Sequence, residues 1–179
     1  MAVTVTKLEA ASRQLDTAIR LFFSGGDAVS THTLAVAAAN VFADMAEHQK
    51  AGVSWRTKVR DDSGLSTKEL KKIFHEEWNF FKHADHDPDA TLQFNELVSQ
   101  DLMFMAVLDC GDLQPTTCPM QAFQIWYIAV HPEHFPGDEQ VFDDARQALP
   151  GISQLERSVQ IQHGAAFVTQ HCAPMNVKT

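Results

Sequence analysis

"TKLEAASRQLDTAIRLFF", residues 6–23, sets the fold class, because its apolar residues recur at the spacing of a helix. Steps of three and four place these side chains on one face, which is typical of an amphipathic helix. "SGGD" (24–27) comes directly afterwards, and glycine readily takes the backbone conformation that closes a helix. The sequence therefore predicts a helix over these residues. Its apolar face is formed by Leu8, Ala11, Leu15, Ala18, Ile19 and Phe22.

The same period appears next in "TLAVAAANVFADMAEH" (33–48), where a second helix is predicted. Ser30 or Thr31 is the expected N-cap, since a hydroxyl can accept a hydrogen bond from the first-turn backbone. The many alanines predict close packing against a neighbouring helix. The expected buried stripe consists of Leu34, Ala37, Ala38, Val41, Phe42 and Met45.

A long connection is expected over residues 49–65, after which "STKE" (66–69) has the form of a capping box. We expect the third helix to run from this box to about Ala84, with Pro88 in the turn that follows. Its apolar stripe includes Leu70, Ile73, Phe74, Trp78 and Phe81.

Further helical patterns fill the C-terminal half. A fourth helix is expected to begin near Asn95 and to end at Gly111. Thr117 and Pro119 mark the start of a fifth, because proline is tolerated in the first turn. Two more are expected over 139–149 and from Ser153 onward.

Strand signals are weak along the whole chain, so the predicted fold class is all-α. We expect a single domain over residues 1–179, packed as an antiparallel bundle of about six to seven helices. Residues 171–179 are expected to form a frayed tail.

The charge balance limits the partners that the chain can bind. The formal net charge is −9, from 14 Lys and Arg residues against 23 Asp and Glu residues. Phosphate binding depends on clustered Lys and Arg, so we expect no broad DNA-binding surface. No apolar run reaches the length of about 18 residues that a membrane-spanning helix requires, and no signal-peptide pattern opens the chain.

Three cysteines, Cys110, Cys118 and Cys172, are widely spaced and include no CxxC pair. An odd number at irregular spacing favours reduced thiols and a cytoplasmic protein. Cys118 is predicted near a helix N-terminus, where a thiol pKa is lowered, but no base partner accompanies it in the sequence. We expect all three to be structural thiols.

Reactive side chains concentrate in "HEEWNFFKHADHDPDATLQF" (75–94). On a helix, Asn79 and His83 lie one turn apart on one face, beside an aromatic stripe. An imidazole with a pKa near neutrality can relay a proton, and a fixed cation can stabilise a phosphorane. Asn79 and His83 are therefore the candidate catalytic residues, with Lys82 and Asp85 as supports. Alternatively, these residues form only a polar helix end and a solvated turn.

"WNFFKHAD" (78–85) resembles the motif region of HEPN-type helical bundles. The resemblance implies a bundle of four or five helices, often dimeric, with a short polar motif late in one helix. Catalytic members of that family carry an arginine, then commonly a polar residue such as asparagine, and a histidine four residues later. The arginine and the histidine act together on the RNA backbone. Asn79 and His83 match this pattern, whereas Trp78 stands where the arginine is expected.

Two longer segments, "AIRLFFSGGDAVSTHTLA" (18–35) and "NFFKHADHDPDA" (79–90), also resemble parts of small uncharacterised bacterial helical proteins. That second resemblance covers more of the chain than the HEPN-like motif. It agrees with an all-α fold but implies no activity.

A metal site is the other chemical interpretation of the polar stretch, since imidazole and carboxylate suit zinc, iron or manganese. His83, His86 and the neighbouring aspartates crowd one turn. Their spacing matches neither HExxH nor a calcium loop, so no metal ligand is assigned and the cofactor is unknown. Elsewhere, His131 and His134 suit either a pair of loop ligands or a polar turn. His32 is expected at the surface, in the first turn of the second helix.

Two functions follow from these patterns. One is a HEPN-like bundle associated with RNA or a nucleotide, centred on Asn79 and His83. The alternative is a non-enzymatic protein that binds a partner, in which the turn at 83–89 is a structural junction or an incidental divalent-metal site. A homodimer is expected, because "FQIWYIAV" (123–130) carries aromatic residues suited to a core or a dimer face.

Overall fold

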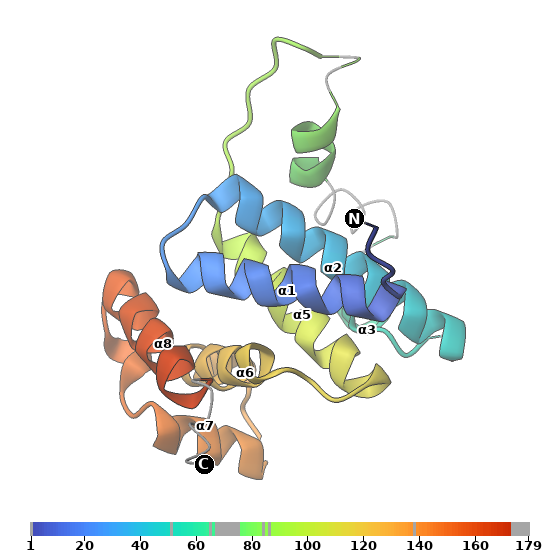
Figure 1. Ribbon diagram of the computed structural model, residues 1–179. Helices are drawn as coiled ribbons and strands as arrows, with labels where there is room; N and C mark the ends of the chain where they lie inside the picture. Colours follow the sequence, from blue (N-terminus) through green and yellow to red (C-terminus); the bar gives the residue numbers. More distant parts are fainter. Residues whose placement is uncertain are drawn as a thin grey trace.

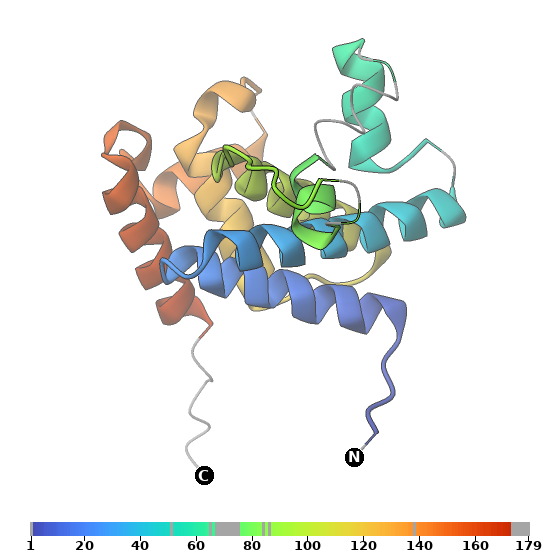
Figure 2. The ribbon, with the colours of Figure 1, turned by 90° about the horizontal axis from the view of Figure 1, so that it is seen from above.

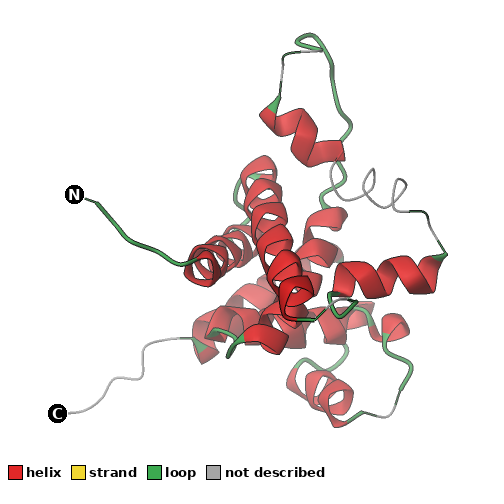
Figure 3. Ribbon diagram, turned by 90° about the vertical axis from the view of Figure 1, so that its right-hand side faces the viewer, coloured by secondary structure: helices red, strands yellow, loops and turns green. Residues whose placement is uncertain are grey.

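The computed structural model contains only helices, turns and loops in the part of the chain that it describes (Figure 3). This confirms the predicted all-α fold class. Strong helical periodicity in most segments is the physical reason, since each amphipathic helix must bury its apolar face against another. The described residues are 2–50, 52–64, 66, 76–83, 85, 87–137 and 139–172.

The helices follow the predicted order, with one unpredicted helix added over Trp55–Ser63. Residues 76–82 are also helical. Helices with defined bounds are α1 (Lys7–Phe23), α2 (Ala28–Gln49), α3 (Trp55–Ser63), α5 (Leu97–Leu113), α6 (Cys118–Val130), α7 (Gln140–Ala148) and α8 (Arg157–His171). Two short 3-10 helices are η1 (Pro132–His134) and η2 (Ile152–Gln154).

Two groups of helices make up the bundle (Figures 1 and 2). α1 and α2 run antiparallel and both pack against α5. α6 packs against α7 and α8, and α1 also contacts α6 and α8. The first helix therefore joins the two groups, which agrees with its strongly apolar buried face.

The core is richest in aromatic residues where α1 meets α6. Phe123 and Trp126 are fully buried, and Phe23 meets the Trp126 ring edge-on at a centroid distance of 5.2 Å. The indole nitrogen of Trp126 donates a 2.8 Å hydrogen bond to the carbonyl oxygen of Gln160 on α8. The aromatic segment 123–130 thus forms core, one of its two predicted roles, because its large side chains and their polar group are satisfied inside the bundle.

The start of α1 is confirmed and the start of α2 is corrected. Thr6 and Glu9 form a capping box, in which each side chain accepts a hydrogen bond from the other's backbone N–H. α2 begins earlier than predicted, because Asp27 is its N-cap and accepts a 2.7 Å bond from the backbone N–H of Ser30. Ser30 and Thr31, the expected caps, lie inside the first turn.

The buried face of α2 also differs from the predicted stripe. Ala38 and Phe42 are buried as expected, but Leu34 and Met45 are only partly buried. α2 packs against both α1 and α5, so it buries a broader surface than a single stripe. Its buried residues are Thr31, His32, Ala35, Val36, Ala38, Phe42, Ala43 and Ala46.

α3 overturns the prediction that residues 49–65 form only a connection. Ser54 caps the helix by accepting a hydrogen bond from the backbone N–H of Thr57. The Glu47 carboxylate accepts bonds from the Ser54 hydroxyl at 2.6 Å and from the Gly52 N–H at 2.7 Å. These bonds lower the pKa of Glu47 to about 2. The helix was missed because its polar sequence carries no apolar period.

α5 and α6 begin close to their predicted starts. Asn95 accepts a 3.1 Å hydrogen bond from the Leu97 N–H, and Thr117 is the N-cap of α6 as expected. α5 does not end at Gly111, however, and continues to Leu113. Glycine alone is a weak stop signal, since the backbone at Gly111 does not take a positive φ.

The predicted third helix is confirmed over residues 76–82 only. Its capping box and the apolar residues Leu70, Ile73 and Phe74 lie outside the described residues. Figure 1 shows this helical segment and the loop that follows it projecting away from α1 and α2.

A disulfide between Cys118 and Cys172 corrects the prediction of reduced thiols. It joins the first residue of α6 to the residue after α8, across a Cα–Cα distance of 5.5 Å. The two cysteines are 54 positions apart, so the spacing of cysteines in the sequence could not predict that they pair. Cys110 is the free, buried cysteine. The premise for a cytoplasmic protein is therefore removed.

Two residues of the predicted frayed tail, His171 and Cys172, are held by the fold. His171 is the last residue of α8, and Cys172 is held by its disulfide. Residues 173–179 lie outside the described residues. Within the described ranges, every helix is too short or too polar to cross a membrane.

Candidate ligand-binding site

Three consecutive polar residues near the start of α5 connect it to its neighbours. Ser99 and Gln100 are buried, and Asp101 lies beside them at the surface. Ser99 Oγ lies 3.1 Å from Nδ1 of His32 on α2. Asp101 accepts a 2.8 Å hydrogen bond from the hydroxyl of Tyr127 on α6. Buried polar groups require partners, so these bonds fix the orientation of α5 within the bundle.

Gln100 lies between Arg157 of α8 and His131 at the end of α6. Its Oε1 accepts a 2.5 Å hydrogen bond from Arg157 Nη2, and its amide nitrogen lies 3.1 Å from His131 Nε2. An amide nitrogen can only donate, so His131 Nε2 accepts and the ring proton lies on Nδ1. Nδ1 faces a carboxylate oxygen of Glu133 at 3.3 Å. Arg157 thereby determines the histidine tautomer through Gln100.

Arg157 is a half-buried cation at the first position of α8. Its guanidinium carbon lies 5.1 Å from the Trp126 ring centroid and 5.5 Å from that of Phe22. Burial lowers the pKa of Arg157, although a guanidinium stays charged in proteins. Among the described residues, no carboxylate forms an ion pair with it. The Asp101 and Glu96 carboxylates act on it only through space and raise its pKa, so the guanidinium can still pair directly with an anionic ligand.

A cavity of about 470 Å³ opens beside Arg157. Three helices begin at its wall, since Ala28, Leu97 and Arg157 are the first residues of α2, α5 and α8. Helix N-termini carry partial positive charge and exposed N–H groups, both of which favour anions. The cavity is lined by Phe22, Gly25, Gly26, Ala28, Thr31, Glu96, Leu97, Ser99, Arg157 and Ile161.

Glu96 is the one lining carboxylate and opposes the positive potential of this cavity. Glu96 is exposed, so solvent strongly screens the charge of its carboxylate. Arg157 is half-buried, so its field is screened less. The balance therefore favours an anion near Arg157, with apolar contacts available from Phe22 and Ile161.

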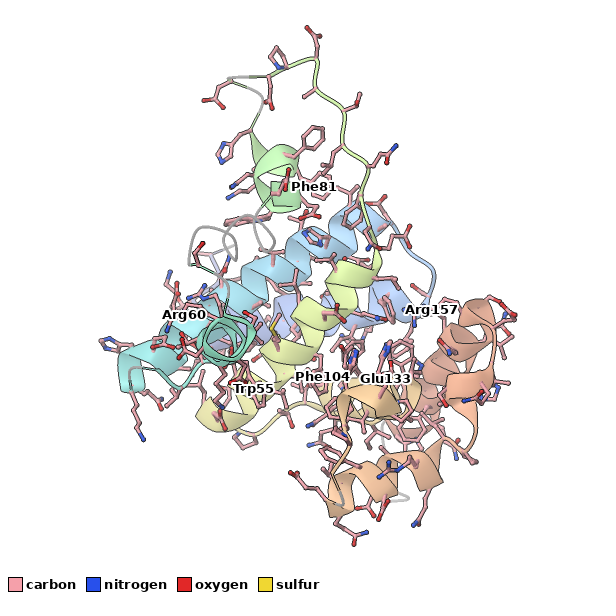
Figure 4. All side chains as sticks on the ribbon, turned by 180° about the vertical axis from the view of Figure 1, so that it is seen from behind. Trp55, Arg60, Phe81, Phe104, Glu133 and Arg157 are labelled. Carbon is pink, nitrogen blue, oxygen red and sulfur yellow. A yellow bond between two sulfur atoms is a disulfide. The ribbon has the colours of Figure 1, made fainter. Side chains whose placement is uncertain are left out.

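A second cavity of about 330 Å³ lies between α3, α5 and α6, with mainly apolar walls. Tyr127, Asp101 and His134 contribute its polar groups. Burial and the Asp101 carboxylate raise the pKa of Tyr127, so its hydroxyl stays protonated. Figure 4 shows Trp55, Phe104 and Glu133 on this side of the bundle, with Arg157 nearer α8. The remaining lining residues are Trp55, Val59, Phe104, Met105, Leu108 and Phe135.

His32 is buried, which overturns its predicted surface position. Phe81 and Phe94 pack edge-on against its ring, at centroid distances of 5.8 and 5.0 Å. Nε2 has no hydrogen-bond partner among the described residues, and burial lowers the pKa of His32 to about 4. The ring therefore stays neutral near pH 7, bonded to Ser99 through Nδ1. α2 turns it inward because α2 packs against α5.

The predicted catalytic residues lie outside this polar centre, on the projecting helical segment. Asn79 and His83 are exposed, one turn apart, and the His83 N–H donates to the Asn79 carbonyl. The Lys82 ammonium lies 3.0 Å from the centroid of the Trp78 ring. Asp85 is exposed. Phe81, on the same segment, points toward the bundle and contacts His32 (Figure 4).

Arg56 and Arg60, two arginines that could replace the arginine missing from the HEPN-like motif, form ion pairs with other residues. Arg56 binds Asp44 at 2.7 Å, and Arg60 binds Asp61 at 2.8 Å. In the described part of the chain, groups spaced to hold a metal occur at His131, Glu133 and His134. Among the described residues of the turn at 83–89, no such group is found, and His86 lies outside the described residues.

His131 and His134 stand out in the sequence, whereas Ser99, Gln100 and Arg157 do not. These three sit in helical patterns where polar residues are ordinary, so their types alone gave no signal. Comparisons of the chain with protein-family models, with curated proteins and with solved structures gave no match.

Proposed function

We propose that this chain binds a small phosphate-bearing ligand, of the nucleotide class, in the cavity beside Arg157. The observation that carries the proposal is the half-buried guanidinium, which has no carboxylate within ion-pair distance among the described residues. Arginine binds phosphate through a planar fork, and three helix N-termini at the wall add to the attraction. The geometry supports binding, and no group in this cavity is assigned a catalytic step.

The size and walls of the cavity suit that ligand class. Its volume of about 470 Å³ falls in the range of small-molecule sites. Phe22 and Ile161 provide apolar surface for a base or sugar, while Ser99 and Thr31 provide hydroxyls. Most ligand sites combine such apolar walls with a few placed polar groups.

Calorimetric titration with adenosine monophosphate and with inorganic phosphate tests the proposal. Arg157→Met removes the charge but keeps an apolar side chain, and we expect at least a tenfold loss of affinity for both probes. Arg157→Lys retains a cation without the fork and should show an intermediate loss. Arg146→Met is the control, because Arg146 lies exposed on α7 and pairs with Asp143. Equal affinity in Arg157→Met and wild type would reject the site.

RNA binding at the projecting segment is a second candidate function. It is supported by the exposed cluster of Asn79, Lys82 and His83 and by the HEPN-like sequence. A fluorescent single-stranded RNA measures both binding and cleavage. His83→Ala should reduce either activity at least tenfold, while the exposed His163→Ala on α8 should not. If both variants behave as wild type, this hypothesis fails.

The homodimer stays a prediction. A homodimer is compatible both with a non-enzymatic binding protein and with a HEPN-like protein. Sedimentation equilibrium of the purified chain measures the mass directly, and a mass near 19.9 kDa would contradict a dimer.

A further inference from the structure

We propose that His131, Glu133 and His134 form a divalent-metal site, which zinc fits best, and that the side-chain amide of Gln100 controls its affinity. Nδ1 of His131, a carboxylate oxygen of Glu133 and a ring nitrogen of His134 all lie within 4.8 Å of one another. Two imidazoles and one carboxylate are a frequent protein ligand set for zinc that keeps a fourth position open. This site lies outside the cavity beside Arg157.

The three ligand atoms are close to metal-binding distances, but the His131 and His134 rings stack at a centroid distance of 5.2 Å and an angle of 9°, so the His134 ring must rotate to aim its lone pair at the metal. Tetrahedral zinc with bonds of about 2.0–2.1 Å holds its ligand atoms about 3.3–3.4 Å apart. Glu133 Oε1 lies 3.3 Å from His131 Nδ1 and 3.9 Å from His134 Nε2. Glu133 and His134 are exposed and free to adjust, whereas His131 is held by the bundle. η1 creates the arrangement, because its single turn folds all three residues onto one side.

The side-chain amide of Gln100, as oriented in this structure, opposes zinc binding at His131 and thereby lowers the affinity of the site for zinc. Zinc needs the lone pair of His131 Nδ1, and a neutral ring coordinated there carries its proton on Nε2. That N–H would point at the amide nitrogen of Gln100, which is also a donor. Metal binding therefore moves the ring proton from Nδ1 to Nε2, with no proton released. It also requires the Gln100 amide to rotate and present its oxygen.

Arg157 opposes this rotation. Its Nη2 donates to the Gln100 oxygen that would have to turn toward His131. The outer partner of a metal-bound histidine is normally an acceptor that orients the ring. Gln100 is in the position of that partner but is turned the wrong way. Gln100 is thus a positioning residue. The site binds zinc weakly when the Gln100 amide nitrogen faces His131 and tightly when the amide oxygen faces it.

The location of the site suggests a use for the metal. His134 also lines the mainly apolar cavity of about 330 Å³, together with Tyr127 and Asp101. A metal held by His134 would therefore sit at the rim of that cavity. An open coordination position there suits a ligand with a metal-binding head and an apolar body.

Zinc titration of the full chain, monitored by competition with a chromophoric chelator, tests the proposal. The protein is kept free of reductant, so that Cys118 and Cys172 stay paired and do not bind metal. We expect one zinc per chain. Glu133→Gln and His134→Ala change exposed residues and should each lower the affinity at least tenfold. His163→Ala, also exposed, is the matched control and should have no effect.

Gln100→Glu tests the positioning role separately. A carboxylate accepts from both Arg157 and His131 Nε2–H, so the variant should bind zinc about 10–100-fold more tightly than wild type. Cobalt substituted for zinc should show the strong visible absorption of a tetrahedral site in Gln100→Glu and lose it in the double variant with His134→Ala. Unchanged zinc affinity in His134→Ala overturns the site, and unchanged or weaker affinity in Gln100→Glu overturns the role of Gln100. Neither result depends on ligand binding beside Arg157.

Discussion

Gly164 of α8 packs directly against the Phe23 ring of α1. A Cβ atom built on Gly164 of α8 would lie 2.1 Å from the Phe23 ring of α1, and its backbone does not take a positive φ. Gly164→Ala should therefore lower the free energy of unfolding by about 1–3 kcal/mol through overpacking. Gly111→Ala on α5 is the matched control, since its Cβ would meet only the Thr116 methyl at 3.7 Å. Urea denaturation measures both. Gly111→Ala should be neutral or stabilising by up to about 1 kcal/mol.

Two buried residues give opposite dependences of stability on pH. Burial raises the pKa of Asp109 to about 6 from its ordinary 3.8 and lowers that of His32 to about 4 from 6.5. Asp109 therefore destabilises the fold as pH rises from about 4 to 6, because the unfolded carboxyl ionises first. His32 destabilises it as pH falls over nearly the same window, because the unfolded imidazole is protonated first. The two effects largely cancel in the wild type.

Single substitutions should uncover each effect. In Asp109→Asn, whose amide oxygen still accepts from the Trp55 N–H, stability should fall by up to about 3 kcal/mol between pH 6.5 and 4 relative to wild type. In His32→Asn it should rise by a similar amount as pH falls from 6 to 4. Urea unfolding at several pH values measures both trends. Asp144→Asn, an exposed change on α7 whose charge contributes to neither pKa shift, should leave the wild-type profile in place. Parallel profiles for all the variants would contradict this account.

At the scale of elements, the disulfide fixes both ends of the C-terminal group. It closes a loop spanning 54 positions, from the start of α6 to the end of α8. In the chain-entropy model, closing such a loop stabilises the fold by about 4 kcal/mol. Dithiothreitol should therefore lower Tm in the wild type but not in Cys118→Ser/Cys172→Ser. Mass spectrometry that found three free thiols in the untreated protein would contradict the pairing.

Local sequence patterns predicted most helices, because each signal there is contained in neighbouring residues. The helix over residues 7–23 and the cap at Thr117 are examples that the structure confirms. α3 was missed because polar helices lack an apolar period, and its Ser54 cap depends partly on Glu47 of another helix. Pairings between distant residues, such as Cys118 with Cys172, are set by tertiary packing and leave no trace in spacing.

In the candidate site, too, residues with a local sequence signal were predicted and residues that depend on tertiary packing were not, and here most of the important residues are of the second kind. His131 and His134 were noticed because histidine is chemically distinctive within a loop. Arg157, Gln100 and Ser99 were missed because their roles come only from what the other helices place beside them. The motif residues Asn79 and His83 attracted attention through sequence resemblance, and their place on the projecting segment could not be read from the pattern.

Across the whole molecule, Gln100 links the two proposed sites. An anion that binds Arg157 competes for the Nη2 group that now donates to Gln100 Oε1. Once that bond is released, the amide can rotate and accept from His131 Nε2–H, which frees Nδ1 for the metal. The two ligands should therefore bind cooperatively, and linkage requires that each raises the affinity for the other by the same factor. Loss of one hydrogen bond to a charged group, about 1.5–3 kcal/mol, sets the upper limit of this coupling.

Sulfate tests the coupling, because it has the shape of phosphate and binds zinc weakly. Zinc affinity should rise by about tenfold in sodium sulfate over sodium chloride at equal ionic strength, which corresponds to about 1.4 kcal/mol. Gln100→Glu should abolish the difference, since its carboxylate accepts from both neighbours without rotating. Arg157→Met should abolish it too, with zinc affinity already raised in chloride, because nothing then holds the Gln100 oxygen away from His131. An equal response to sulfate in all three proteins would show that the anion acts elsewhere and that Gln100 does not connect the sites.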